Sequence, residues 1–348
     1  MRRTILLTGA SGVVGRAVLE RLRDVDVVCL THQKALPGTG VAIVRGDVSR
    51  PLLGLSAAKF AELARRIQYI VHSAAMTAFN QPEGVIRDVN IVGTQRVLEL
   101  AARAGVPLCH LSTAFAYADQ HVPAGHRTHP YEVSKREAEQ AVRTSGVPAV
   151  IVRPSIVIGD SVDGSMTQFQ GFHFLMDLIV RGSFPLPGTA QALVDVVPRD
   201  LVASVVAALV ARPDITGEYW VTSGDRALSL SQTVTIWAEH WHRLTGQPVR
   251  RPRMVSPDIV ERLARPAFLP ALPKELQATM SHALHLVKYV NITRPFPSSL
   301  AQLAALIGSP LLPTPELTLI RNVEGWSRHI GAGWSGPALS SSPRQPWA

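Results

Sequence analysis

The segment from residue 4 to residue 15 constrains the fold more than any other stretch of the chain. Thr4-Ile-Leu-Leu-Thr8 is a short apolar run, typical of a strand buried on both faces of a parallel sheet. It leads into the loop Gly9-Ala-Ser-Gly-Val-Val-Gly15, after which apolar residues recur at helical spacing. A strand, a glycine-rich loop and a helix in this order are the setting of a dinucleotide-binding site. A glycine-rich turn that binds no ligand is the alternative, and the flanking elements favour the cofactor site.

Each glycine of this loop has its own predicted role. Gly9 permits a tight turn, Gly12 lets the backbone approach a pyrophosphate, and Gly15 lets the helix pack closely on the strand. The N–H groups at the start of the following helix favour an anion there. The cofactor-binding residues predicted from this loop are Gly9, Ser11, Gly12, Val13, Val14 and Gly15.

The end of the second predicted strand, residues 26–30, bears on the choice between NAD and NADP. An NAD-binding chain usually has Asp or Glu here, which holds the hydroxyls of the adenosine ribose. This chain has Thr31-His-Gln-Lys34 instead, and His32 with Lys34 would suit a 2′-phosphate. The sequence therefore favours NADP(H) over NAD(H) as the cofactor.

Further strands and helices alternate through the first part of the chain. Apolar runs predict strands at 41–45, 69–72, 106–111 and 149–152, and helical patterns cover 56–66, 85–104 and 131–145. This alternation predicts an α/β fold with a Rossmann-type, doubly wound parallel sheet and right-handed crossovers. The carboxyl edge of such a sheet would collect the glycine loop, Asp47, residues 73–75 and Thr113.

Tyr131 and Lys135 are the strongest candidates for catalysis. Four residues apart on a predicted helix, they share one face. There the ammonium group of Lys135 would lower the pKa of the Tyr131 phenol and make it a usable proton donor or acceptor near neutral pH. A solvated surface pair is the alternative, and the cofactor loop upstream weighs against it.

The character of the chain changes after Pro154, and this change predicts its domains. Residues 1–154 are expected to form an NADP-binding Rossmann domain, with segments of 190–222 completing the sheet. Residues 155–330 combine helical patterns with prolines and are expected to form a smaller, mostly helical substrate-binding lobe or lid. Residues 331–348, rich in Ser, Pro and Gly, are expected to be a disordered tail.

Together these motifs resemble the extended short-chain dehydrogenases/reductases. The matching pieces, in the order typical of that family, are Thr8–Gly15, Gly46-Asp-Val48, Tyr131-x-x-Ser-Lys135 and Arg153-Pro-Ser155. A finer similarity, to the branch with thioester reductase domains and fatty acyl-CoA reductases, covers about the first 200 residues. It is carried by Leu53–Ser56, Ile70–Ala75, Asp88–Thr94, Leu111–Thr113, Arg153–Asp160 and Asp195–Asp200.

The resemblance implies roles for individual residues. It implies Thr113, Tyr131 and Lys135 as the catalytic residues, with Lys135 also holding the nicotinamide ribose. It implies Asp47 as the residue that contacts adenine. The cofactor-binding residues expected outside the glycine loop are His32, Lys34, Asp47, Val48, Ser73, Ala74, Ala75, Asn90, Lys135, Pro154 and Ser155.

The implied activity is the NADPH-dependent reduction of an acyl thioester, carried by CoA or an acyl carrier protein, to an aldehyde or an alcohol. A ketoreductase, an alcohol dehydrogenase or a sugar-nucleotide epimerase with the same triad is the alternative. A non-catalytic NADP-binding protein is a third hypothesis, against which the intact triad argues. The oligomeric state is left open, although a homodimer is common in the proteins that this chain resembles.

Composition excludes several other classes. A hydrophobic content of 46% with 18% charged residues is typical of a compact protein, and the longest apolar run, 201–211, is too short to span a bilayer. Cys29 and Cys109 lie in apolar runs, which predicts buried thiols and a reducing, cytoplasmic location. The net charge of +9 raises nucleic acid as a partner, but only Arg250–Arg253 forms a basic cluster, so none is expected. No metal site is predicted, because neither histidine pair, 240/242 nor 282/285, has a third ligand at useful spacing.

Overall fold

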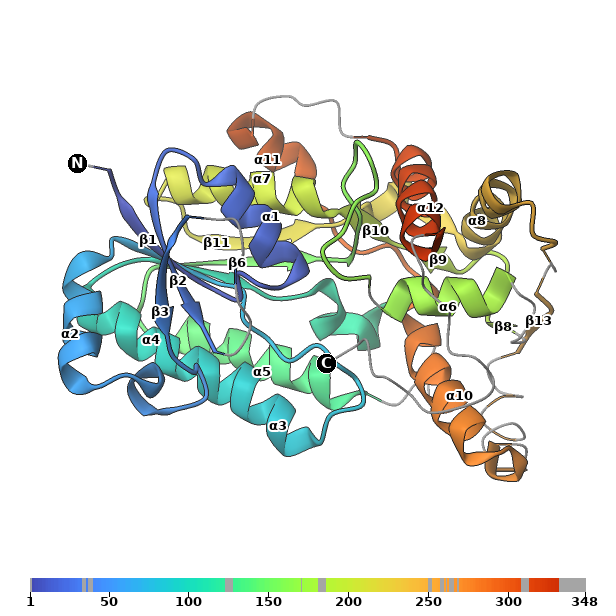
Figure 1. The fold of residues 1–348 in the computed structure, drawn as a ribbon, viewed down its shortest axis with the longest axis horizontal. Helices are drawn as coiled ribbons and strands as arrows, with labels where there is room; N and C mark the ends of the chain where they lie inside the picture. The colour runs from blue at the N-terminus through green and yellow to red at the C-terminus, as the bar shows by residue number, and fades with distance from the viewer. Residues whose placement is uncertain are drawn as a thin grey trace.

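The structure is a computed structural model, and it describes most of the chain (Figure 1). The described residues are 2–32, 36, 40–122, 128–169, 171–180, 186–249, 252–256, 260, 262, 266–267, 269–307 and 313–331. Within these ranges no helix combines the length and the apolar composition that a membrane crossing would require. The predicted tail lies outside the described residues apart from Gly331, as do Lys34, Arg250 and Arg251.

A seven-stranded parallel sheet forms the centre of the molecule. Its strand order is β11-β6-β5-β4-β1-β2-β3, which confirms the predicted Rossmann-type, doubly wound fold. The strands are β1 (Thr4–Thr8), β2 (Asp26–Thr31), β3 (Ala42–Arg45), β4 (Tyr69–His72), β5 (Leu108–Leu111), β6 (Ala149–Pro154) and β11 (Gly217–Val221). The order reverses between β1 and β4, so the glycine loop after β1 lies at the switch point where such sheets bind ligands.

Helices cover both faces of this sheet (Figure 1). On one face α1 (Val13–Arg21), α7 (Arg199–Ala211) and α11 (Leu300–Ile307) share an apolar core with the strands. On the other face α2 (Ala57–Arg66), α4 (Gly93–Ala104) and α5 (Pro130–Thr144) pack on a second core. The central strands β1, β4 and β5 are buried along their whole length because helices cover both of their faces, whereas the edge strands β3 and β11 are partly exposed. Cys29 and Cys109 belong to the first core, which confirms the predicted buried thiols.

Local sequence signals account for several helix boundaries. Ser56 caps α2 by accepting a hydrogen bond from Lys59 N, and Gly105, with a φ of 68°, ends α4 in the left-handed conformation. The helix predicted at 85–104 is continuous but not uniform. It runs as α3 (Glu83–Arg87), a π turn at Asp88–Val92 and then α4. The π turn carries Asn90, and such turns are frequent at functional sites.

Four later helices surround a separate apolar core. They are α6 (Gly171–Val180), α8 (Leu230–Thr245), α10 (Lys274–Val287) and α12 (Pro315–Gly331). Short strands join this part to the sheet: β7 (Ile156–Ile158) with β10 (Val196–Pro198), β9 (Leu193–Val194) with β12 (Leu228–Ser229), and β8 (Leu186–Pro187) with β13 (Met254–Val255). In Figure 1 these helices lie beyond the carboxyl ends of the central strands, next to the end of α5 that begins at Pro130.

Candidate active site

The glycines of the first loop divide into two that pack and one that faces open space. Gly9 has a φ of +73°, and a Cβ there would lie 2.5 Å from Ala74 N. A Cβ on Gly15 would lie 2.1 Å from Gly9 O, so neither position has room for a side chain. Gly12 is exposed, and a Cβ there would meet nothing closer than Gly9 O at 3.4 Å. The loop therefore has its backbone bare at Gly12, where a ligand would approach.

The start of α1 suits an anion. Gly12 is the N-terminal cap of this helix, and the first turn contains no acidic residue. Val13 is buried, whereas Ser11 and Val14 are only half-buried beside the open face of Gly12. The free N–H groups of a helix start together with an uncovered glycine fit the pyrophosphate of a dinucleotide.

The loop after β4 closes one side of this site. Thr8 Oγ1 contacts His72 Nδ1 at 2.8 Å and accepts from Ala74 N at 3.2 Å. These bonds hold Ser73 and Ala74 against Gly9, and residues 73–75 remain half-buried. The structure thus brings the predicted residues Ser73, Ala74 and Ala75 to the same edge as the glycine loop.

Asp47, predicted to contact adenine, lies in a small polar cluster after β3. Its Oδ1 accepts from Ser49 N at 2.9 Å and from Ser49 Oγ at 2.7 Å. His32 Nε2 and Arg50 Nε lie 3.7 Å and 3.9 Å from Oδ2. Burial opposes ionisation, but these hydrogen bonds and the nearby basic groups lower the pKa of Asp47 below its usual value. Arg50 was not predicted as a site residue, because a loop side chain has no periodicity that would place it beside Asp47.

A left-handed turn supports this cluster. Leu52 and Leu53 have φ values of 54° and 57°, which non-glycine residues rarely adopt. Leu53 is fully buried, and its carbonyl accepts from Asp47 N at 2.8 Å. Val48 packs against Gly93, where a Cβ would lie 3.0 Å from Val48 Cγ2. The packing of Val48 and Leu53 holds the loop, and with it Asp47, in place.

The three predicted catalytic residues meet at the end of β5. Thr113 caps the 3₁₀ helix Ala114–Gln120, and its hydroxyl is hydrogen-bonded to the Tyr131 phenol. Lys135, one helical turn after Tyr131, is buried and donates from Nζ to Leu111 O at 2.7 Å. The side chain of Tyr131 is half-buried, so this group remains open to a substrate.

The predicted effect of Lys135 on Tyr131 is wrong in this structure. Burial raises the pKa of Tyr131 to about 12, the charge of Glu132 raises it further, and the Thr113 hydrogen bond opposes both. Lys135 is not among the groups that shift this pKa, and its ammonium group donates to the Leu111 carbonyl. Burial lowers the pKa of Lys135 itself to about 8, against the opposing charge of Glu139. Near neutral pH the phenol is therefore a proton donor.

Asn90, predicted to bind the cofactor, is hydrogen-bonded within the protein on both its oxygen and its nitrogen. Its Oδ1 accepts from Met76 N at 2.7 Å, and its Nδ2 donates to Ser134 Oγ at 2.9 Å and to Met76 O at 3.1 Å. These bonds tie the loop after β4 to α5. Asn90 thus links the loop after β4 to the helix that carries Tyr131 and Lys135.

Pro154 and Ser155 lie at the end of β6, beside the catalytic group. The Thr113 hydroxyl is 3.4 Å from Pro154 O, and Ser155 N donates to Val221 O at 3.2 Å. Nearby Asp195 accepts from Ser223 N and Gly224 N at 2.8 Å and 3.0 Å. Burial raises the pKa of Asp195 to about 6 despite these bonds. The strand ends 154–155 and 221–224 thus form the far wall of the site.

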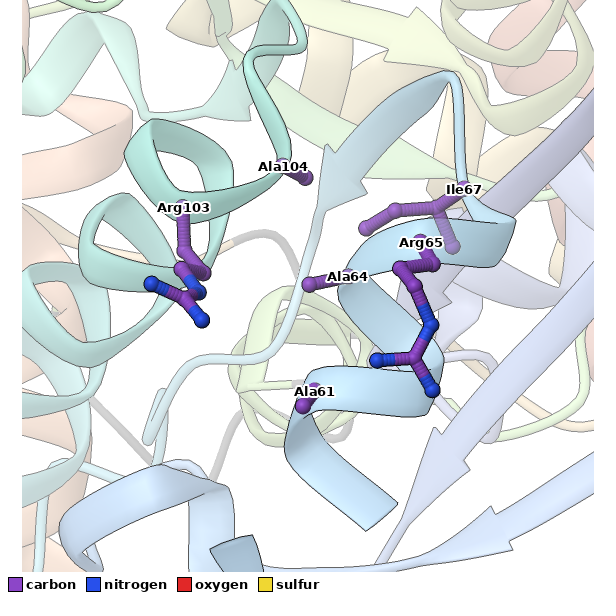
Figure 2. Close-up of a pocket in the computed structure, with 6 residues that line it drawn as sticks. All are labelled: Ala61, Ala64, Arg65, Ile67, Arg103 and Ala104. Atoms are coloured by element: carbon purple, nitrogen blue, oxygen red, sulfur yellow. The ribbon is translucent and has the colours of Figure 1, made fainter. Parts of the chain in front are cut away.

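A cleft of about 370 Å³ lies away from these residues (Figure 2). It is lined by Ala61, Ala64, Arg65, Ile67, Arg103 and Ala104, where α2 and α4 end. Because β4 and β5 begin just after these helices, the cleft lies at the amino edge of the sheet, opposite the glycine loop. Figure 2 shows the guanidinium groups of Arg65 and Arg103 on either side of it. It has no part in the candidate active site.

The predicted histidine pairs do not come together as metal ligands. His240 Nδ1 and His242 Nδ1 contact the carbonyls of Ile236 and Gln247, and His282 packs on Phe174. Among the described residues no group of three or more His, Cys, Asp or Glu side chains is arranged to hold a metal ion.

Known proteins resemble this chain in sequence and in fold. Residues 30–206 match the NAD-binding family described as male sterility protein. A hybrid PKS-NRPS synthetase, pvhA of Talaromyces variabilis, is 31% identical over 227 residues, covering 61% of this chain. The chain spans only 6% of that relative's length.

Two solved structures extend the resemblance beyond the family match. The terminal R domain of the myxalamid PKS-NRPS pathway has 25% identity and a TM-score of 0.74, covering 95% of this chain and 91% of its own. The reductase (R) domain of a nonribosomal peptide synthetase from Mycobacterium tuberculosis has 24% identity and a TM-score of 0.67, covering 95% and 92%. The second likeness concerns the fold alone.

Proposed function

This chain belongs to the NAD-binding male sterility protein family, whose members are extended short-chain dehydrogenases/reductases, and we propose from that premise that it reduces carrier-bound acyl thioesters with NADPH. The observation that carries the proposal is the Thr113–Tyr131–Lys135 group at the end of β5, on the same carboxyl edge of the sheet as the bare backbone at Gly12. The similarity to the terminal R domain of the myxalamid PKS-NRPS pathway and to a hybrid PKS-NRPS synthetase supports a thioester on a carrier protein as the substrate. As an NAD(P)-dependent oxidoreductase, the chain would act on a substrate carbonyl placed at the Thr113–Tyr131–Lys135 group.

The residues present fit a dinucleotide. The start of α1 would hold the pyrophosphate, and Asp47 would face the adenosine half. His32 and Arg50 bring two basic groups to the same loop, where a 2′-phosphate would lie, which favours NADPH over NADH. When bound, the cofactor supplies the hydride.

Tyr131 and Thr113 would bind the substrate carbonyl oxygen by two hydrogen bonds. Because burial raises the pKa of Tyr131 to about 12, its phenol is protonated at neutral pH and gives its proton to the oxygen as negative charge develops there. Loss of the thiol from the reduced carbon leaves an aldehyde, and a second reduction would leave an alcohol. Lys135, held by Leu111 O, would keep the floor of the site positive and hold the ribose.

The helices α6, α8, α10 and α12 supply the remaining wall. We assign residues 155–330 to a substrate-binding lobe and residues 1–154 to the cofactor domain, with α7 and β11 completing the sheet. The separate apolar core of these helices supports this division. The acyl chain and the carrier arm would enter between the lobe and the end of β5.

The decisive experiment follows NADPH and free thiol together. The intact protein is given acyl-CoA thioesters, pantetheine thioesters on a purified acyl carrier protein, ketones and aldehydes. Thiol release in step with NADPH loss supports the proposal. Oxidation of NADPH with ketones alone, and no thiol release, would identify a ketoreductase and overturn it. An isomerised sugar nucleotide without net NADPH loss would identify an epimerase.

Tyr131→Phe tests the triad. Its kcat is expected to fall by about 10²- to 10⁴-fold, since the proton donor is lost, with little change in NADPH affinity. Tyr219→Phe is a matched control, because Tyr219 lies in β11 and its hydroxyl donates to the carbonyl of Thr216, just before that strand. Wild-type turnover in Tyr131→Phe would contradict the catalytic assignment.

Arg50→Ala tests the preference for NADPH. The variant is expected to bind NADPH about tenfold more weakly and NADH almost unchanged, since one charged contact to a phosphate is lost. Arg103→Ala, in the cleft of Figure 2, is the control for net charge. Equal weakening of both cofactors would show that Arg50 does not read the 2′-phosphate.

A further inference from the structure

Glu132, the residue after Tyr131, is buried and bonded to side chains from the far part of the chain. Its Oε1 lies 2.5 Å from Lys288 Nζ and accepts from the Tyr289 hydroxyl at 2.6 Å. Its Oε2 accepts from His129 N at 3.2 Å at the start of α5. Lys288 and Tyr289 are buried too and follow directly on α10. The carboxylate is thus fully engaged, and two of its three partners come from the C-terminal helices.

A second link joins the same segment to the Tyr131 ring. Phe79, in the loop after β4, lies with its ring centre 5.5 Å from that of Tyr131 and 5.2 Å from that of Tyr289. The His129 ring packs on Phe79 at 4.8 Å. Residues 288–289 therefore reach Tyr131 along two routes: through Glu132 to its backbone, and through Phe79 to its ring.

We infer that Lys288 and Tyr289 are positioning residues that set Tyr131 for proton transfer through Glu132. The inference rests on the proposed function, which makes Tyr131 the proton donor. It adds that the donor is set correctly only when the end of α10 is seated on α5. Substrate binding against the C-terminal helices would then be coupled to the acid that acts on the substrate.

The charges make this arrangement more than a packing contact. An ion pair removed from water is costly unless every polar atom is satisfied, and here the partners satisfy the carboxylate. The charged and titratable groups around Tyr131 and Glu132 are Lys135 and His129 with α5, His285 and Lys288 at the end of α10, and Tyr289. The negative charge of Glu132 raises the pKa of Tyr131, and the ammonium group of Lys288 pairs with that carboxylate.

The test compares Glu132→Gln, Lys288→Met and the double variant Glu132→Gln/Lys288→Met with the wild type. Lys274→Met is the control, because Lys274 is an exposed lysine at the start of the same helix α10. Measurements are kcat and the thioester KM across pH, the Kd for NADPH, and Tm. The double variant covers the case in which one unpaired buried charge prevents folding.

Lys288→Met is expected to lower kcat about tenfold or more, with the Kd for NADPH within about twofold of wild type, because a misplaced donor slows the chemical step. As the pH is raised, both variants that lack the Glu132 charge are expected to lose activity at a lower pH than the wild type does. Their phenol gives up its proton earlier, and reduction needs the protonated form. Lys288→Met, which keeps Glu132, shows no such downward shift.

The inference is overturned if kcat falls only in proportion to Tm in every variant and the pH at which activity is lost on the alkaline side does not change. That result would show that the Glu132–Lys288 pair only stabilises the fold. Wild-type kcat in Lys288→Met would overturn the inference as well. If no substrate is reduced, the proposed function fails, and the inference is then tested without activity. The ultraviolet absorbance of the protein is followed as the pH is raised, and the same curve for Tyr131→Phe is subtracted to leave the titration of the Tyr131 phenol. A lower Tyr131 pKa in the double variant then supports the inference, and an unchanged one overturns it.

Discussion

Helix α5, which carries Tyr131 and Lys135, is held in place by a buried carboxylate that can be neutralised without changing its shape. Glu139 has no exposed surface, and it accepts from Ser112 Oγ at 2.5 Å and from Tyr117 OH at 2.8 Å. It also binds Arg153 through both oxygens, at 2.9 Å and 2.6 Å, and Arg143 at 2.8 Å. Glu139→Gln keeps the side-chain shape and removes the charge.

The expected cost follows from what Arg153 retains. Arg153 has 3% of its side chain exposed and would keep a single carboxylate, that of Glu218 at 2.5 Å. The new amide nitrogen would also face the guanidinium donors. Breaking one side of a buried ion pair costs about 3–5 kcal/mol, so Glu139→Gln should lower the free energy of unfolding by about that amount. Tyr117→Phe removes one hydroxyl donor and should cost about 1 kcal/mol.

Urea unfolding followed by circular dichroism measures both effects, with Tm as a second readout. Glu137→Gln is the matched control, because Glu137 lies on the same helix and its pairing with Arg87 at 3.4 Å is exposed. That control should stay within about 0.5 kcal/mol of wild type. A loss below about 1 kcal/mol for Glu139→Gln would refute the reasoning. So would full additivity with Arg153→Met, because partners in one network should couple.

Three further predictions concern other parts of the structure. Gly12→Ala should keep the Tm and weaken NADPH binding, while Gly15→Ala, whose Cβ would lie 2.1 Å from Gly9 O, should lower the Tm sharply; a fluorescence titration of NADPH and a melting curve separate the two. The free energy of unfolding of the wild type should rise with pH between about 8 and the usual pKa of a lysine. Burial lowers the pKa of Lys135 in the folded protein, so in this pH range the unfolded chain binds a proton that the folded chain has lost. Lys135→Met should abolish this pH dependence in urea unfolding. Leu52→Asn should raise the free energy of unfolding by about 0.5–1 kcal/mol, because asparagine tolerates the left-handed backbone better; a loss would contradict this.

Much of the fold could be predicted because its signals are local. Each strand of the sheet is a short apolar run, and the glycine loop and its flanking helix occupy neighbouring positions in the sequence. The spacing of Tyr131 and Lys135 predicted one helix face, and the strand ends predicted which loops would meet. The sequence did not predict the role of Arg50 beside Asp47, since loop side chains have no period to place them.

The predicted effect of Lys135 failed for a physical reason that spacing cannot reveal. Two residues four apart on a helix can touch, but a buried ammonium group binds the strongest acceptor within reach. Here that acceptor is the Leu111 carbonyl at the end of β5, and the Tyr131 phenol binds Thr113 instead. The hydrogen bonds of Asn90 to Met76 and Ser134 could not be read from the sequence either, because these residues lie 14 and 44 positions away.

By itself, the sequence determined the class of fold, and it predicted the loop for the cofactor and the three residues proposed to act on a carbonyl. Only the tertiary structure decided how the phenol is set, because that depends on contacts between residues far apart in the chain. Glu132 and Tyr289 are 157 positions apart, and their hydrogen bond exists only once α10 has packed against α5. Local periodicity encodes which face of an element is apolar, whereas burial and pairing of charges depend on what the rest of the chain brings to that face.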